Sequence, residues 1–295
     1  MAGERSFEHA ELRVKDLGEA TAFYKEVMGL VEIYREGKTV YFGCGFDANY
    51  DLAVTEGGTG VEHFAVRVKD EEELERFAHN IKRLNVPIEI TEGREPNELK
   101  AVRFNLPGGF NMELVTVKGN NYHFPHAPVL KERGILAPID ADHINLMSTH
   151  VQKDAEFLQS ISFHITDVKL ENDGSWVQAF TRKETYHHDV AFGQTKSNTE
   201  SLHHFAWYVS DFNHIRMIAD RITQFDKGIE VGPGRHVTGS NLFCYFWEPG
   251  GNRFEYTVEV ATVSYDMPTR FEYKSESKFS AWDGIIRPES FKRGS

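Results

Sequence analysis

One pattern of predicted elements recurs four times along the chain, and this repeat constrains the fold more than any other feature of the sequence. Each copy opens with an alternating apolar and polar run, continues with apolar residues at helical spacing, and closes with short strand-like runs. The opening runs of three copies read FEHAELRV, VEHFAVRV and LHHFAWYV. We therefore expect four βαβββ modules, at residues 7–56, 60–118, 139–195 and 200–260.

The modules are expected to work in pairs. A single module of this kind would leave one face of its small sheet bare, so two modules should close around a shared core. This reasoning predicts an α+β fold with an N-terminal domain at 1–125 that has no catalytic role and a C-terminal catalytic domain at 139–260. The remaining segment, 261–295, has mixed composition and is compatible with a docked tail or with a lid over a pocket.

Charge and cysteine content limit the partners and the compartment. The formal net charge of −12 argues against binding to nucleic acid or to an anionic membrane, because both require surplus Lys and Arg. No apolar run approaches the length of a membrane span, and the first residues lack a signal-peptide core. The two cysteines, Cys44 and Cys244, allow at most one disulfide, so we expect a soluble protein of the cytoplasm.

Adjacent histidines at 203 and 204 raise the question of which imidazole points inward. Successive side chains of a strand face opposite sides, so only one of the two should face a shared core. Matching VEHFAVRV to LHHFAWYV places His63 and His204 at the same position. We therefore expect His204 to point inward and His203 to point outward.

Three residues of the C-terminal half occupy positions from which they could share a cation. His143 lies on the first strand of the third module, His204 on the first strand of the fourth, and Glu255 on its last strand. Taken singly, each has an ordinary structural explanation, as a strand-end polar group, a packed histidine and a surface carboxylate. Taken together, two imidazoles and one carboxylate are typical of a non-haem metal site with open coordination positions.

The stretch GRHVTGSNLFCYFWEPGGNRFE, residues 234–255, resembles the signature of the type I extradiol catechol dioxygenases, two-domain members of the vicinal oxygen chelate superfamily. The matching positions are Gly234, His236, Tyr245, Glu248, Pro249, Gly251 and Glu255. Cys244 departs from the pattern, because the family usually has a larger aliphatic residue or Phe there. The resemblance covers residues 7–260 and implies the glyoxalase-like vicinal oxygen chelate fold.

The resemblance also implies roles for individual residues. The cofactor would be Fe(II), with Mn(II) as the alternative, held by His143, His204 and Glu255. Three further residues match the acid–base histidine and two groups that hydrogen-bond the catechol: His188, His236 and Tyr245. His187 is the alternative acid–base residue, because the spacing to the ligand histidine suggests a one-residue insertion.

The implied reaction is extradiol cleavage of a small aromatic diol by O2, giving a 2-hydroxymuconic-semialdehyde-type product in aromatic hydrocarbon catabolism. Some relatives that act on catechols with an acidic side chain carry an Arg where this chain has Val231, although Arg235 remains, and this difference favours an uncharged substituent or none. Trp176, Phe180 and Trp247 are candidate pocket walls or ordinary core residues. The alternatives are another metal-dependent, glyoxalase-like enzyme and a non-catalytic aromatic-binding relative. By family analogy the protein is a homo-oligomer.

A second triad, His9, His63 and Glu113, occupies matching positions in the first two modules. Counting back from Glu113 puts Arg94 and Arg103 where the other triad has His236 and Tyr245. Arginines beside a divalent cation would repel it. We therefore expect this triad to be a relic with no catalytic role, structural or at most an incidental metal binder.

Overall fold

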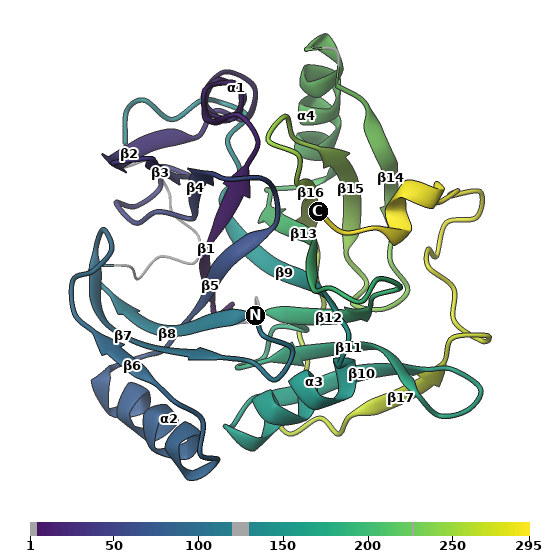
Figure 1. Cartoon of the computed structure of the whole chain (residues 1–295). Helices are drawn as coiled ribbons and strands as arrows, with labels where there is room; N and C mark the ends of the chain where they lie inside the picture. The colour runs from purple at the N-terminus through teal and green to yellow at the C-terminus, as the bar shows by residue number, and fades with distance from the viewer. Residues whose placement is uncertain (1–4, 120–129, 226) are drawn as a thin grey trace.

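The computed structural model describes residues 5–119, 130–225 and 227–295 (Figure 1). The first module comprises β1 (Phe7–Val14), α1 (Leu17–Phe23), the π-turn η1 (Tyr24–Met28), β2 (Val31–Glu36), β3 (Thr39–Gly43) and β4 (Leu52–Glu56). The second comprises β5 (Val61–Arg67), α2 (Glu71–Arg83), β6 (Glu89–Thr91), β7 (Glu98–Asn105) and β8 (Asn111–Val117).

The C-terminal half repeats this order. The third module comprises β9 (Asp140–Ser148), α3 (Val151–Ser160), β10 (His164–Leu170), β11 (Trp176–Arg182) and β12 (Val190–Gln194). The fourth comprises β13 (Ser201–Tyr208), α4 (Phe212–Gln224), β14 (Ile229–Arg235), β15 (Leu242–Trp247) and β16 (Arg253–Val258). Strand β17 (Arg270–Tyr273) and the 3-10 turn η2 (Glu289–Lys292) follow.

Aspartates begin three of the helices. The side chains of Asp16, Asp70 and Asp211 each accept a hydrogen bond from the backbone amide three residues on. Such a cap satisfies one of the amides that the first helical turn leaves without an intrahelical partner. The acidic residue before these three helices is therefore a local reason why the chain turns from strand to helix there, whereas α3 begins at His150 without a side-chain cap.

Each half forms one sheet from the strands of its two modules. The strand order is β2-β3-β4-β1-β5-β8-β7-β6 in the first sheet and β14-β15-β16-β13-β9-β12-β11-β10-β17 in the second. The opening strands of the two modules pair antiparallel at the centre of each sheet, β1 with β5 and β9 with β13. The predicted α+β fold of four paired βαβββ modules is confirmed.

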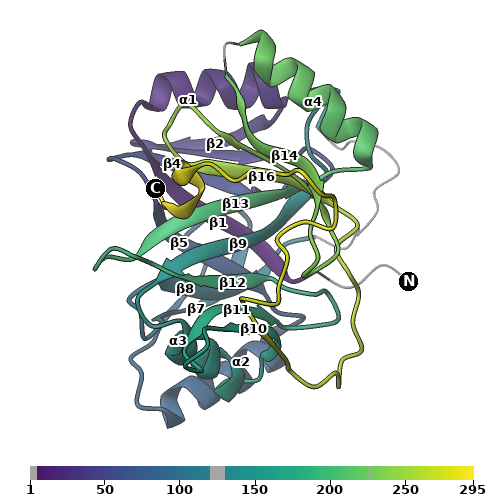
Figure 2. The ribbon, with the colours of Figure 1, turned by 90° about the vertical axis from the view of Figure 1, so that its right-hand side faces the viewer.

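The two sheets share one hydrophobic core. Along β15, Leu242, Cys244 and Phe246 belong to a cluster that also contains residues of the N-terminal half. Across the boundary, the ring centroids of Tyr24 and Phe254 lie 5.9 Å apart. We call the opposite side of each sheet, turned away from this shared core, its outer face. The helices flank the core in two pairs, α1 beside α4 and α2 beside α3 (Figure 2).

Because one core joins the halves, their division into domains at 1–125 and 139–260 stays a prediction. Its boundary at residue 125 and part of the joining segment lie outside the described residues. Within the described ranges, no helix is both long and apolar enough to cross a membrane.

The C-terminal segment wraps around the outer face of the second sheet (yellow in Figure 1). It first adds β17 as a parallel edge strand beside β10. Further on, Phe279 and Phe291 pack with Phe243 and Tyr245 of β15. Ser295 then exchanges backbone hydrogen bonds with Leu202 at the start of β13. The segment is docked along its length and covers the face on which the candidate metal ligands lie.

Candidate metal centre

His143, His204 and Glu255 meet on the outer face of the second sheet, on the neighbouring strands β9, β13 and β16. The two Nε2 atoms lie 3.2 Å apart. Glu255 Oε2 lies 3.3 Å from His143 Nε2 and 3.0 Å from His204 Nε2. All three side chains are buried. Pairing of Ala206 with Glu255 in the register of β13 and β16 sets this convergence.

The three atoms fit one face of an octahedral ion. Metal–ligand bonds of about 2.1 Å place neighbouring ligands of an octahedron about 3.0 Å apart. The three ligand–ligand distances, 3.0 to 3.3 Å, match this spacing. Imidazole and carboxylate without thiolate suit iron or manganese. The residues present therefore fit the ion that the sequence predicted.

Asp142 fixes the tautomer of His143. Asp142 Oδ1 lies 2.5 Å from His143 Nδ1, and Oδ2 accepts a hydrogen bond from the Tyr186 hydroxyl at 2.7 Å. A carboxylate can only accept, so the proton of the imidazole resides on Nδ1. In neutral His143 the lone pair is therefore on Nε2, which faces the other two ligand atoms.

His203 fixes the tautomer of His204. The Nε2–H of His203 donates to the Phe291 carbonyl oxygen at 2.9 Å, so its Nδ1 accepts the Nδ1–H of His204 at 2.7 Å. Again Nε2 of the candidate ligand carries the lone pair. A register shift between Leu202 and His204 lets the adjacent imidazoles touch. His203 is outside the triad as expected, but the C-terminal segment covers it, so it does not point into solvent.

His187 and His188 repeat this arrangement beside the triad. Asp167 Oδ2 accepts from His187 Nε2 at 2.8 Å, so His187 Nδ1 accepts the Nδ1–H of His188 at 2.9 Å. The His188 ring lies 4.2 Å from that of His143, between centroids. Arg270 of β17 contacts both oxygens of Asp167, at 2.6 and 2.7 Å. Of the two neighbours, His188 faces the triad with an unprotonated Nε2.

His236 and Tyr245 lie at the other side of the triad. Tyr245 pairs with Glu255 in the register of β15 and β16. The Phe279 carbonyl accepts from His236 Nδ1 at 3.2 Å, so the Tyr245 hydroxyl donates to His236 Nε2 at 2.8 Å. His236 Nε2 lies 3.8 Å from Glu255 Oε1. The structure thus brings all six residues singled out from the sequence into one neighbourhood.

Burial and charge set the protonation of these groups. Burial lowers the pKa of His204 and His236 to about 4, and it lowers that of His188 well below its ordinary value. His143 is the exception: burial opposes its charge, but hydrogen bonds to Asp142 and Glu255 raise its pKa to about 9. Apart from His143, whose extra proton a bound cation would displace, the site gathers negative charge and neutral imidazole, which suits a divalent cation.

Other contributors went unnoticed in the sequence. Asn241 Nδ2 donates to Glu255 Oε1 at 3.2 Å and to Thr257 at 2.8 Å, orienting the carboxylate. Its position within the signature stretch was a signal, but no pattern separated it from an ordinary turn residue.

Of the three candidate pocket-wall residues, Phe180 lies nearest the site, with its ring centroid 5.3 Å from that of His188. The other two candidate wall residues contact different partners, Trp176 with Phe271 and Trp247 with Arg253.

Comparison with protein-family models matches residues 6–114 and 140–256 to the Glyoxalase/Bleomycin resistance protein/Dioxygenase superfamily. Among curated proteins, the chain is similar to the manganese-dependent 2,3-dihydroxybiphenyl 1,2-dioxygenase of Geobacillus genomosp. 3. The two are 29% identical over 266 residues, which cover 84% of this chain and 83% of the relative. A metapyrocatechase of Pseudomonas sp. (strain CF600) is 28% identical over 258 residues, with 84% and 83% covered.

A solved structure shows the same arrangement of elements. The 2,3-dioxygenase LapB from Pseudomonas sp. KL28 superimposes with a TM-score of 0.82 at 26% sequence identity. The superposition covers 93% of this chain and 99% of that one. The likeness therefore extends over both halves of the chain.

Proposed function

Because the chain belongs to the Glyoxalase/Bleomycin resistance protein/Dioxygenase superfamily, we propose that it is an extradiol dioxygenase that cleaves a catechol with O2. In this proposal His143, His204 and Glu255 hold Fe(II), with Mn(II) as the alternative. One observation carries it: three ligand atoms lie 3.0 to 3.3 Å apart with both imidazole lone pairs directed inward by hydrogen-bonded neighbours. The names of the two curated relatives support the same chemistry.

When bound, the cation would lower the pKa of a catechol hydroxyl and hold the diol and O2 side by side. Burial keeps His188 neutral, so its unprotonated Nε2 can accept a proton from the diol. The His187–Asp167 pair stabilises the imidazolium that results. His188 can then return this proton during ring opening. Tyr245 and His236 would orient the diol by hydrogen bonds.

The proposed substrate is a catechol with an uncharged substituent or none, and the product is of the 2-hydroxymuconic-semialdehyde type. Val231 belongs to an apolar cluster with Phe243, Tyr245 and Phe291. Nearby cations are already paired: Arg253 with Glu230, Arg270 with Asp167, and Arg235 with Glu259. An acidic side chain on the ring would therefore lack a free cationic partner among these three arginines.

We also place the enzyme in the cytoplasm, as a homo-oligomer. Both cysteines, Cys44 and Cys244, are buried free thiols, which suits a reducing compartment. The edge strand β17 exposes Phe271 and Tyr273, and an edge strand of this kind can pair with a second copy of the chain.

The test is oxygen consumption. The protein is loaded anaerobically with Fe(II) and mixed with catechol or 3-methylcatechol, and an oxygen electrode and visible absorption follow the reaction. We expect oxygen uptake with a yellow product, which Glu255→Gln abolishes and Glu259→Gln, an exposed glutamate nearby, retains. Bound iron without oxygen uptake from either catechol refutes the proposal in favour of a non-catalytic binder or a different reaction.

A further inference from the structure

The outer face of the first sheet carries a second cluster of potential ligands. His9 of β1, His63 of β5 and Glu113 of β8 meet there, as the module alignment predicted. Glu95, from the loop between β6 and β7, joins them, and the ligand atoms of all four lie within 4.8 Å of one another. Glu95 has no counterpart at the other triad. We propose that these four residues form a closed, structural site for a zinc ion, an inference that does not rest on the dioxygenase function.

Three of the six ligand–ligand distances in the cluster, two of them to different oxygens of Glu95, are close to the edge of a tetrahedron. His63 Nε2 lies 3.5 Å from Glu95 Oε1 and 3.5 Å from Glu113 Oε1. His9 Nε2 lies 3.4 Å from Glu95 Oε2. Zinc bonds of about 2.1 Å place the corners of a tetrahedron about 3.4 Å apart. The spacing is wider than at the C-terminal triad, as expected for four ligands around one ion.

Two buried atoms of the cluster lack hydrogen-bond partners. Within the described part of the chain, these two atoms are His63 Nε2 and Glu113 Oε2. The side chains are only 9% and 2% exposed. An unsatisfied polar atom in such a place costs about 1–3 kcal/mol. A cation bound by His63 Nε2 and Glu113 Oε2 would remove both deficits, while Glu113 Oε1 would keep its contact with Arg103.

The local charge also favours a cation. Arg103 Nη2 contacts three carboxylates: Glu95 at 2.9 Å, Glu98 at 3.3 Å and Glu113 at 3.0 Å. Three carboxylates against one guanidinium leave an excess of two negative charges when the imidazoles are neutral.

The prediction that two arginines lie beside this triad was right for Arg103 and wrong for Arg94. Arg94 instead pairs with Glu89, and its side chain is 53% exposed. One arginine remains, and the carboxylates around it outnumber it.

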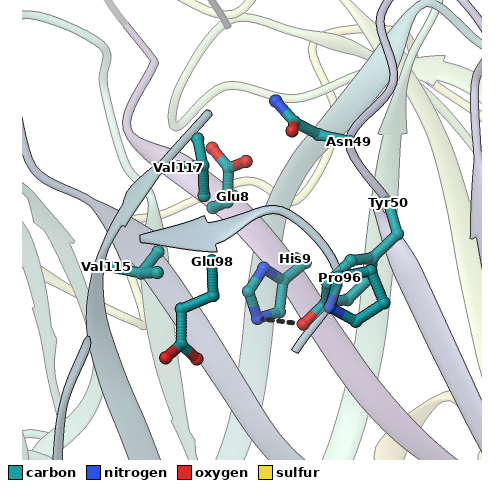
Figure 3. Close-up of a pocket in the computed structure, with 8 residues that line it drawn as sticks. All are labelled: Glu8, His9, Asn49, Tyr50, Pro96, Glu98, Val115 and Val117. Carbon is teal, nitrogen blue, oxygen red and sulfur yellow. Dashed lines mark hydrogen bonds between the residues drawn. The ribbon is translucent and has the colours of Figure 1, made fainter. Parts of the chain in front are cut away.

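Tyr50 and a small pocket border the cluster. The Tyr50 hydroxyl lies 2.7 Å from His9 Nε2 and donates to Glu95, so it would turn from His9 when an ion binds. The pocket is lined by Glu8, His9, Asn49, Tyr50, Pro96, Glu98, Val115 and Val117 (Figure 3). With four protein ligands, a tetrahedral zinc has no open position, so the site would stabilise the fold and take no substrate.

Metal titration of the full chain tests the site. In a His204→Gln, Glu255→Gln background that disables the C-terminal triad, the chelator-stripped protein is titrated with Zn²⁺ alone and followed by calorimetry. We expect one bound equivalent and a raised melting temperature. Adding Glu95→Gln should weaken binding at least ~100-fold. Glu98→Gln removes the same charge beside Arg103 from a residue that is not a ligand, and it should retain binding.

Cobalt provides a second readout that does not depend on affinity. Co²⁺ in the same background should give the intense visible bands of tetrahedral coordination, and these should vanish in Glu95→Gln and in His63→Gln. Circular dichroism shows whether each variant is folded. The proposal is overturned if the background binds no zinc, if a folded Glu95→Gln variant binds as tightly as its parent, or if cobalt shows only a weak six-coordinate spectrum.

Discussion

Two pairs of adjacent histidines carry the chemistry of the candidate centre at the scale of single residues. In each pair the outer imidazole donates through Nε2 to a fixed acceptor and accepts through Nδ1 from its neighbour. The inner imidazole is thereby left with its lone pair on Nε2. For His204 this atom faces the metal ligands, and for His188 it faces the place where the diol would bind. One hydrogen-bonding arrangement thus prepares a ligand and a proton acceptor.

Replacing Asp167, which accepts the hydrogen bond from His187, should therefore impair catalysis. In Asp167→Asn the amide can donate to His187, which favours the wrong tautomer of both histidines. We expect kcat to fall about 10- to 100-fold with KM and iron content little changed. Steady-state kinetics on iron-loaded protein checks this. Asp173→Asn, in the exposed turn between β10 and β11, is the matched control and should keep full activity; an equal loss there would contradict the assignment.

The sequence predicted the inner residues of the site better than their supports. His143, His204 and Glu255 can be recognised from the sequence because they occupy matching module positions. Strand alternation and module pairing then predict that their side chains point to the same face. Asp167 could not be found in this way, since its role depends on a contact across 20 positions of chain with His187. The carbonyl groups of Phe279 and Phe291 could not be predicted either, because every residue has a backbone oxygen and the sequence does not show which one accepts a hydrogen bond.

At the scale of elements, the C-terminal segment is part of the centre. Its carbonyls at Phe279 and Phe291 set the tautomers of His236 and His203, and its strand β17 supplies Arg270 to Asp167. The sequence left a docked tail and a lid as alternatives, because residues 261–295 lack periodicity. Buried Arg253 anchors the segment by donating to the carbonyls of Ser290 and Arg293. These contacts make it an integral support for the site.

Deleting residues 289–295 should weaken metal binding. The deletion removes the Phe291 carbonyl and the hydrogen bonds of Ser295 with Leu202, so His204 loses the fixed proton on Nδ1. We expect Fe(II) affinity to fall roughly 10- to 100-fold. Iron retention on dialysis against a graded chelator measures it. Phe291→Ala keeps the carbonyl and should lose much less; if it matches the deletion, the aromatic ring and not the carbonyl is responsible.

The anchoring of β17 should depend on pH. Burial opposes the charge of Asp167, but His187 and Arg270 lower its pKa to about 2, from 3.8. A depressed carboxyl pKa stabilises the fold above its ordinary pKa, and this contribution is lost as the pH falls toward 2. We expect Asp167→Asn to cost about 1 kcal/mol of unfolding free energy at pH 6, allowing for solvent screening. The difference should shrink between pH 5 and pH 3 in urea titrations; a gap that widens on acidification would contradict this.

At the scale of the whole molecule, the N-terminal half supports the strand that carries Glu255. The turn between β15 and β16 docks on the N-terminal half: Glu248 accepts from the Tyr24 hydroxyl at 3.0 Å, and Asn252 accepts from the Gly60 amide and donates to the Arg13 carbonyl. The acidic–Pro–Gly part of the signature stretch therefore serves the contact between halves. The sequence indicated that modules pair within each half, but it gave no sign of the core between them, because strand alternation identifies an apolar face without identifying the sheet that packs on it.

The two halves should consequently unfold together. Tyr24→Phe leaves the buried Glu248 carboxylate without one donor, which should lower the unfolding free energy by about 1–2 kcal/mol. Urea denaturation followed by fluorescence and circular dichroism should show one coincident transition for both proteins. Tyr34→Phe, at an exposed position, should change stability by less than about 0.5 kcal/mol. Two separate transitions in the parent protein would refute the shared core.

Anomalous diffraction at the iron edge, from crystals grown anaerobically with Fe(II), tests the central claim most directly. We predict a peak bonded to His143 Nε2, His204 Nε2 and one Glu255 oxygen at about 2.1 Å, with the remaining positions held only by water or added catechol. An iron peak elsewhere, or an ion at this place whose other positions are filled by further protein side chains, would contradict the account.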